Sequence, residues 1–148
     1  MGAYFDDLET RSAERRAADL ARALPHLIAR AQKMAPALAD LLTGVDAADI
    51  RTRQDLAALP VIRKSALGRA QKSSPPFGGY TTQAANGFEH VFQSPGPIYE
   101  PGRTSHDWWR LGRALHACGI GAQDIVQNCF SYHMTPAGMI FENAARAV

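Results

Sequence analysis

Apolar side chains return every three or four residues in the first part of the chain, with arginines between them. The repeating positions are Leu20, Leu24, Leu27, Ile28 and Ala31. This spacing places them on one face of a helix, so the pattern predicts an amphipathic helix from Ser12 to about Ala35. Pro25 lies inside this range and removes a backbone hydrogen bond, so a kink and a helix that starts nearer residue 25 both stay open.

Capping residues predict three further short helices. They are expected at residues 36–42, at residues 52–59 and after residue 64. Pro36 suits a first helical turn, and Gly44 is placed to form a left-handed cap after the helix. Thr52 and Asp55 have the spacing of a capping box, with Asp in place of the usual Glu.

The pattern changes after residues 73–87, where Ser, Pro, Gly, Thr and Asn predict a loop and an internal boundary. Beyond it we expect a strand at 88–93, a Pro/Gly turn, a helix from 104 or 105 to 118 that includes Trp108, a strand at 124–130 (DIVQNCF) and a last helix after Thr135-Pro136. Strand, helix, strand, helix is the order of a parallel α/β unit.

The predicted organisation therefore has three parts. They are an N-terminal helical region at 1–72, a loop at 73–87 and the start of an α/β domain at 88–148. Two parallel strands bury little apolar surface, and the sequence contains no third strand to complete a sheet. We therefore expect an α/β domain that is truncated at Val148.

Composition narrows the class of protein. The 148 residues include 16 basic and 14 acidic ones, and the basic residues form no single stripe, so we expect no nucleic-acid partner. Apolar runs are too short to span a bilayer and the N-terminus has no apolar signal core, which predicts a cytoplasmic protein with no membrane partner. Cys118 and Cys129 have no zinc or disulfide spacing, so both are expected to be buried as small hydrophobic residues.

Two loops are candidates for chemistry because each follows a predicted strand, where α/β folds place ligands. In the first, FQSPGPIYEP, Ser94 and Gly96 could offer a hydroxyl and an N–H to a phosphate. Pro95 and Pro97 lack the N–H that such a cradle uses, so a plain structural turn is the simpler interpretation.

The second loop, NCFSYHMTPAG, places His133 beside Tyr132. A titratable ring next to an aromatic wall suits the orientation of a carboxylate, although an ordinary packed or surface histidine explains the same residues. No nucleophile signature and no metal-ligand spacing occurs in the sequence, so we predict no catalytic residue and no metal ligand here.

Several segments, in this order, resemble the phenylacetate-CoA ligase branch of the adenylate-forming acyl-CoA synthetases. The resemblance runs from about Tyr4 to Val148 and rests on YFDDLETRS, DIRTRQDLAALPVIRKSAL, PPFGG and, most specifically, GIGAQDIVQNCFSYHMTPAGMIFENAARA. It implies a ligase that forms an acyl-adenylate from a carboxylic acid and Mg-ATP, and then transfers the acyl group to coenzyme A. ATP, Mg²⁺ and coenzyme A are the expected cofactors and co-substrates.

The resemblance also assigns roles to the two loops. At the position of the family's phosphate loop, Ser94, Gly96 and Pro101 agree with the family pattern, whereas Pro95, Pro97, Ile98, Tyr99 and Glu100 depart from it. In the second loop, which walls the acyl pocket in the family, Phe130, Tyr132 and Gly138 agree with the pattern. His133 replaces a small residue, so the substrate-binding residues would be Phe130, Tyr132 and His133, and the acid is left open.

Three interpretations of the whole chain follow. It is an N-terminal portion of a ligase whose parent activates an apolar carboxylic acid and which is inactive by itself, or a non-catalytic homologue that acts as a binding or dimerisation module. The third interpretation, a helical regulator, disagrees with the β-rich segments VFQS and DIVQNCF. Because a cut α/β core exposes sheet edges, we also expect the chain to form a homo-oligomer.

Overall fold

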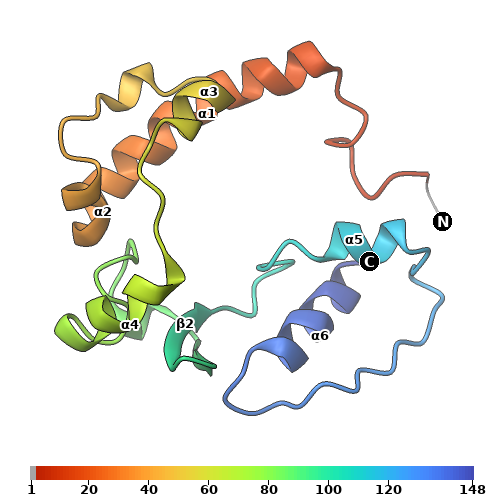
Figure 1. The fold of residues 1–148 in the computed structure, drawn as a ribbon. Coiled ribbons are helices and arrows are strands. Elements are labelled where there is room, and N and C mark those ends of the chain that lie inside the picture. The colour runs from red at the N-terminus through yellow and green to blue at the C-terminus, as the bar shows by residue number, and fades with distance from the viewer. Residues whose placement is uncertain (1–2) are drawn as a thin grey trace. The chain divides into compact units, whose positions relative to one another are not determined.

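The computed structural model describes residues 3–148, which divide into two compact units (Figure 1). The helical unit is Arg11–Gly87. The hairpin unit combines the described residues up to Thr10 with Phe88–Val148. The fold is mixed α/β, and within residues 3–148 all strand pairing belongs to one two-stranded sheet.

The helical unit confirms the helices expected from the sequence. They are α1 (Ala13–Met34), α2 (Pro36–Leu41), α3 (Arg53–Ala57) and α4 (Lys64–Ser73). Two 3-10 turns that were not predicted, η1 (Ala47–Asp49) and η2 (Ala85–Gly87), accompany them. The Ser12 hydroxyl caps α1 by accepting a hydrogen bond from the N–H of Arg15. Helix α1 continues through Pro25, so a start near residue 25 is wrong. Thr52 and Asp55 form the predicted capping box at the start of α3.

An apolar cluster holds the helical unit together. Leu24 and Ile28 of α1 pack with Leu42 and Ile50, and Val45, Ala47 and Leu59 surround them. The side-chain amide of Gln32 closes this end of the unit by donating to the carbonyls of Leu42 at 3.3 Å and Val45 at 2.9 Å. Carbonyls after a short helix lack helical partners, so Gln32 supplies donors that the backbone does not.

The hairpin unit contains an antiparallel sheet instead of the predicted parallel unit. Its elements are β1 (His90–Ser94), β2 (Ile98–Gly102), α5 (Gly112–Ala117) and α6 (Ala137–Ala147). Strands β1 and β2 pair from His90 with Gly102 to Ser94 with Ile98, around a three-residue turn. The short connection favours a hairpin, because parallel strands need a much longer crossover.

The expected strand at 124–130 is wrong. These residues form no strand, and Ile125 is fully exposed at 101% of its reference area. A strand needs a neighbour for its backbone N–H and C=O groups, and no part of the chain that the structure describes pairs with this stretch. The apolar composition alone predicted a strand, whereas the residues run as an irregular loop between α5 and α6 (Figure 1).

The expected helix at 105–118 is shorter than predicted. Only Gly112–Ala117 is helical, because Asp107 and Arg110 adopt positive φ angles of 45° and 59°. The buried Asp107 stabilises this turn by accepting a hydrogen bond from the N–H of Gly112 at 2.9 Å. The preceding turn is tied to α6, since the N–H of Trp108 donates to Asn143 Oδ1 at 2.8 Å.

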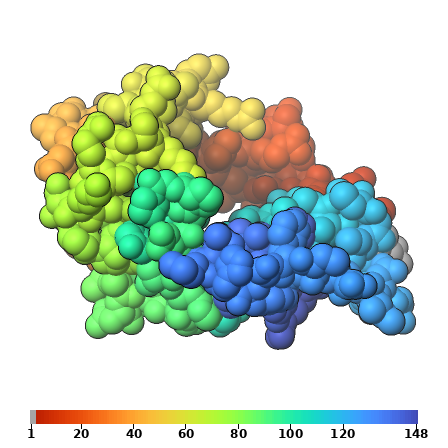
Figure 2. All heavy atoms as spheres, turned by 60° about the horizontal axis from the view of Figure 1, so that its bottom comes forward, coloured from red at the N-terminus to blue at the C-terminus, as the bar shows by residue number. Residues whose placement is uncertain are grey.

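Helices α5 and α6 pack closely against each other. A Cβ atom on Gly112 would lie 2.9 Å from the Cβ of Ala147, so a glycine is required at this contact. Figure 2 shows α6 in blue beside the cyan residues that precede it in the same unit. Ala144 is also buried on α6.

The two cysteines are exposed, which corrects the expectation that both are buried. Cys118 lies at the end of α5, and Cys129 lies in the unpaired 124–130 stretch, where no second layer covers the side chain. No helix within residues 3–148 has both the length and the apolar character needed to cross a bilayer.

Candidate functional site

A groove with a volume of about 610 Å³ lies beside the hairpin turn. Residues 93–97 form one side and residues 133–135 form the other, and we call this space the hairpin groove. Both sides belong to the hairpin unit. Three of the predicted site residues, Ser94, Gly96 and His133, therefore border one groove although they come from two separate loops.

A backbone hydrogen bond joins the two sides. The N–H of Gln93 donates to the carbonyl of Met134 at 2.8 Å. The bond uses the outer edge of β1, which the hairpin leaves without a strand partner. The loop that carries His133 is therefore positioned directly by the strand that leads into the turn.

The turn itself depends on glycine. Gly96 has a φ angle of 153°, and a Cβ atom there would lie 2.9 Å from Cγ1 of Ile98. The hydroxyl of Ser94 donates to the Ile98 carbonyl at 3.4 Å, which is long for such a bond. A hydroxyl rotates easily, so Ser94 can exchange this weak partner for a ligand atom.

His133 presents one nitrogen to its own loop and keeps the other available. The N–H of Thr135 donates to Nδ1 of His133 at 3.4 Å, so in the neutral ring the proton is on Nε2. The side chain is exposed and lines the groove. His133 therefore offers an N–H donor to a carboxylate oxygen in the hairpin groove.

The groove fits a small apolar acid better than a polyphosphate. Pro95, Pro97 and Met134 give it apolar walls, and no lysine or arginine lines it. Because both prolines lack an N–H, Gly96 is the only residue of the 95–97 turn with an amide donor, which is too few for a phosphate cradle. Glu100 pairs with Phe92 across the sheet, outside the residues that line the groove.

The residues that line the hairpin groove consequently do not fit the phosphates of ATP. The described part of the chain also contains no cluster of three His, Cys, Asp or Glu residues that could hold a metal ion. What the groove can do chemically is bind and orient a carboxylate through Ser94 and His133.

Phe130 and Tyr132 lie outside the groove. The ring of Phe130 stacks on Phe141 of α6 with centroids 4.7 Å apart, which anchors the loop to the helix. The hydroxyl of Tyr132 accepts a hydrogen bond from Nδ2 of Asn128 at 2.7 Å. Both side chains stay about half exposed and act on the shape of the loop that carries His133.

Sequence reasoning missed Asn128 and Met134. Asn128 Nδ2 also donates to the carbonyl of Gly138 at 2.8 Å, and its Oδ1 accepts from the N–H of Phe130 at 3.1 Å. An asparagine within a loop is a recognisable turn former, so this role had a local signal. Met134 contributes its backbone carbonyl, for which a side-chain pattern gives no signal.

A carboxylate clasps the open end of the hairpin. Glu89 accepts hydrogen bonds from the hydroxyl of Thr104 and, at 2.6 Å, from the Thr104 N–H. The Thr104 hydroxyl and then its N–H hold the pKa of Glu89 below its usual range, with a smaller effect from the charge of Arg103. The clasp fixes the two strand ends that lie opposite the turn.

Comparisons with known proteins give no further constraint: no protein family, no curated protein and no solved structure matches this chain.

Proposed function

We propose that this chain is the N-terminal part of a phenylacetate-CoA ligase-like enzyme, and that the hairpin groove forms part of its acid-binding surface. One observation carries the proposal. The resemblance assigns Ser94 and Gly96 to one loop and His133 to another, and both loops border the same groove. The proposed location is the cytoplasm, where coenzyme A would be the thiol acceptor.

The acid would bind with its carboxylate toward the donors. An oxygen would accept from Nε2 of His133, and a second contact would come from the Ser94 hydroxyl after it leaves the Ile98 carbonyl. The apolar body would lie against Pro95, Pro97 and Met134. Since no cation lines the groove, binding of the acid would rest on these hydrogen bonds and on apolar contact.

A non-catalytic binding or dimerisation module is the second candidate. It is favoured by the turn at residues 95–97, whose two prolines leave a single N–H where the family has a phosphate loop. It is also favoured by the exposed apolar side chains of the 125–134 stretch, which could contact a second copy. Homo-oligomer formation belongs to both candidates.

Nuclear magnetic resonance titration of the 148-residue chain with phenylacetate tests acid binding. We expect amide shifts at Gln93, Gly96 and Thr135, and none with the neutral analogue 2-phenylethanol at equal concentration. His133→Ala should weaken binding roughly tenfold, as expected for one hydrogen bond to a charged group. His106→Ala is the matched control, because His106 is exposed in the same unit but lies outside the groove.

Activity separates the two candidates. The protein made from the whole reading frame that contains these residues would need phosphate contacts from residues other than the 95–97 turn, and with them it should exchange pyrophosphate into ATP only when the acid is present. Acid binding without exchange would select the non-catalytic module. Shifts that ignore His133→Ala, or that spread over both units, would reject the hairpin groove as the acid site.

A further inference from the structure

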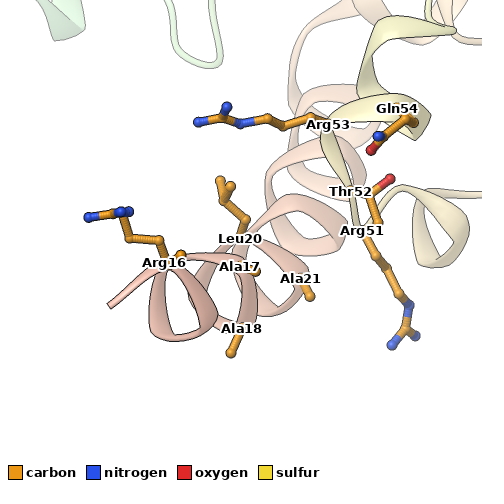
Figure 3. Close-up of a pocket in the computed structure, with 10 residues that line it drawn as sticks. Arg16, Ala17, Ala18, Leu20, Ala21, Arg51, Thr52, Arg53 and Gln54 are labelled. Atoms are coloured by element: carbon orange, nitrogen blue, oxygen red, sulfur yellow. The ribbon is translucent and has the colours of Figure 1, made fainter. Parts of the chain in front are cut away.

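A second groove lies within the helical unit and is separate from the proposed acid site. It has a volume of about 650 Å³ and runs between α1 and the start of α3 (Figure 3). Ala17 and Ala21 line it from α1, and their small side chains leave the space open. Leu20 also lines it and is 37% exposed. We call this space the arginine groove.

The rim of the arginine groove is strongly basic. Arg16, Arg51 and Arg53 line it, and no carboxylate does. Figure 3 shows the side chains of Arg16 and Arg53 extending in the same direction on either side of Leu20, whereas Arg51 extends away from them. Two guanidinium groups therefore flank one apolar side chain, each with several N–H donors in a planar fork.

Nearby carboxylates are already engaged. Asp55 accepts from the N–H groups of Arg51 and Thr52, and Asp19 accepts from Arg11 and Arg22. Their charge therefore does not neutralise the rim through direct pairing with Arg16 or Arg53.

The two rim arginines keep donors available. The Arg53 side chain forms no hydrogen bond and no ion pair within residues 3–148, and the Arg16 side chain commits only Nη1, to the carbonyl of Arg11 at 2.7 Å. The pKa of Glu14 is lowered mainly by hydrogen bonds to its own backbone and to Ser12, and the charge of Arg16 has a smaller effect. Glu14 does not line the groove.

We propose that the arginine groove binds a single molecule of an anionic amphiphile. The apolar body would lie against Ala17, Leu20 and Ala21, and an oxyanion head, carboxylate or phosphate, would contact Arg16 and Arg53. The volume is that of a small-ligand pocket, which is roughly 300–1,000 Å³. Guanidinium groups match carboxylate and phosphate oxygens in a bidentate way, so the head would set the orientation.

Titration of the 148-residue chain with decanoate and with decyl phosphate, both below their micelle concentrations, tests the proposal. We expect amide shifts at Ala17, Leu20 and Gln54 with either anion, and at least roughly tenfold weaker binding of decanol. Arg53→Gln should weaken anion binding roughly tenfold. Arg30→Gln is the matched control, because Arg30 is also exposed on the helical unit but does not line the groove.

A second variant, Leu20→Ser, removes apolar surface while keeping both arginines. This variant should weaken the binding of decanoate more than the binding of the shorter hexanoate, because fewer methylene groups of hexanoate contact the helix. Equal loss in Arg53→Gln and Arg30→Gln would show general charge attraction and overturn the proposal. Binding to phosphatidylglycerol vesicles without binding to either monomeric anion would also overturn it, in favour of a membrane surface. Neither result depends on the acid site of the hairpin unit.

Discussion

The two units hold their chain together in different ways. In the helical unit, the buried side chains of α1 and of the segments that follow it form one apolar cluster. In the hairpin unit, the 125–134 stretch leaves large apolar side chains exposed, and side chain–backbone hydrogen bonds such as those of Asn128 order it. The contrast shows that apolar composition does not by itself place residues inside; a partner surface is also needed.

The largest expected effect is a difference in the free energy of unfolding between two substitutions of the same kind, one in each unit. Ile28→Ala should lower the free energy of unfolding by about 2–5 kcal/mol, because Ile28 is buried in the apolar cluster. Ile125→Ala should change it by less than about 0.5 kcal/mol, because Ile125 is fully exposed. Urea unfolding followed by circular dichroism gives both values. A large cost at Ile125 would mean that this side chain is covered in solution.

A smaller effect is expected from the loop of the hairpin unit. Asn128→Ala removes three hydrogen bonds, to Tyr132, Gly138 and Phe130, and should cost about 1–3 kcal/mol. Tyr132→Phe removes only one of them and should cost less. Amide hydrogen exchange over residues 128–138 would report the loosening. Unchanged exchange in Asn128→Ala would show that other contacts order the loop.

The N-cap of α3 tests how much local hydrogen bonding adds to the stability of the helical unit. Thr52→Ala removes the hydroxyl that accepts from the Asp55 N–H and should lower stability by about 1 kcal/mol. Thr52→Ser keeps the hydroxyl and serves as the control. Thermal unfolding of both variants is the measurement, and an equal loss in the two would assign the effect to the missing methyl group.

Acid should weaken each unit slightly through its hydrogen-bonded carboxylates, which include Asp55 in the helical unit and Glu89 in the hairpin unit. The pKa of Asp55 is lowered first by the Arg51 N–H and then by Thr52, and the pKa of Glu89 is lowered first by the Thr104 hydroxyl. A carboxyl group whose pKa is lower in the folded protein than in the unfolded chain stabilises the fold at pH values above the unfolded-chain pKa, which is roughly 4. This stabilisation is lost as the pH falls through the pKa of the folded protein.

The melting temperature should therefore fall below roughly pH 4. Asp55→Asn should flatten this fall for amide signals of the helical unit, and Glu89→Gln should flatten it for those of the hairpin unit. Asp40→Asn is the control, because the Asp40 carboxylate makes no hydrogen bond to any described residue. A flattening in the opposite unit would contradict the assignment.

Local sequence signals predicted the helical unit well. The apolar repeat around Leu24 and Ile28, the Pro36 start and the capping box at Thr52 all act within a few residues, so sequence spacing is sufficient. Prediction failed where contacts with residues distant in the sequence determine the local conformation. The turn at Asp107 is fixed by its contact with Gly112 and by α6, and the 124–130 stretch lacks the strand that its composition predicted.

The candidate site was predictable only in part, because local signals identify its residues but not the contacts that bring its two loops together. Ser94, Gly96 and His133 were recognised individually as polar or flexible residues of loops, and they do border one groove. The Gln93–Met134 bond that brings the loops together involves only backbone atoms. Phe130 and Tyr132 lie elsewhere, because packing against α6 and the bond from Asn128 fix their directions.

Pro25 leaves one backbone hydrogen bond of α1 unmade near the middle of the helix. It cannot donate a hydrogen bond to the carbonyl of Ala21, and the two buried side chains of α1 flank it, with Leu24 just before it and Ile28 after it. The turns from Ala13 to Ala23 contain no buried side chain, so we expect their amide hydrogens to exchange faster than those that follow Pro25. Those turns also line the arginine groove, so a ligand that binds there should slow this exchange.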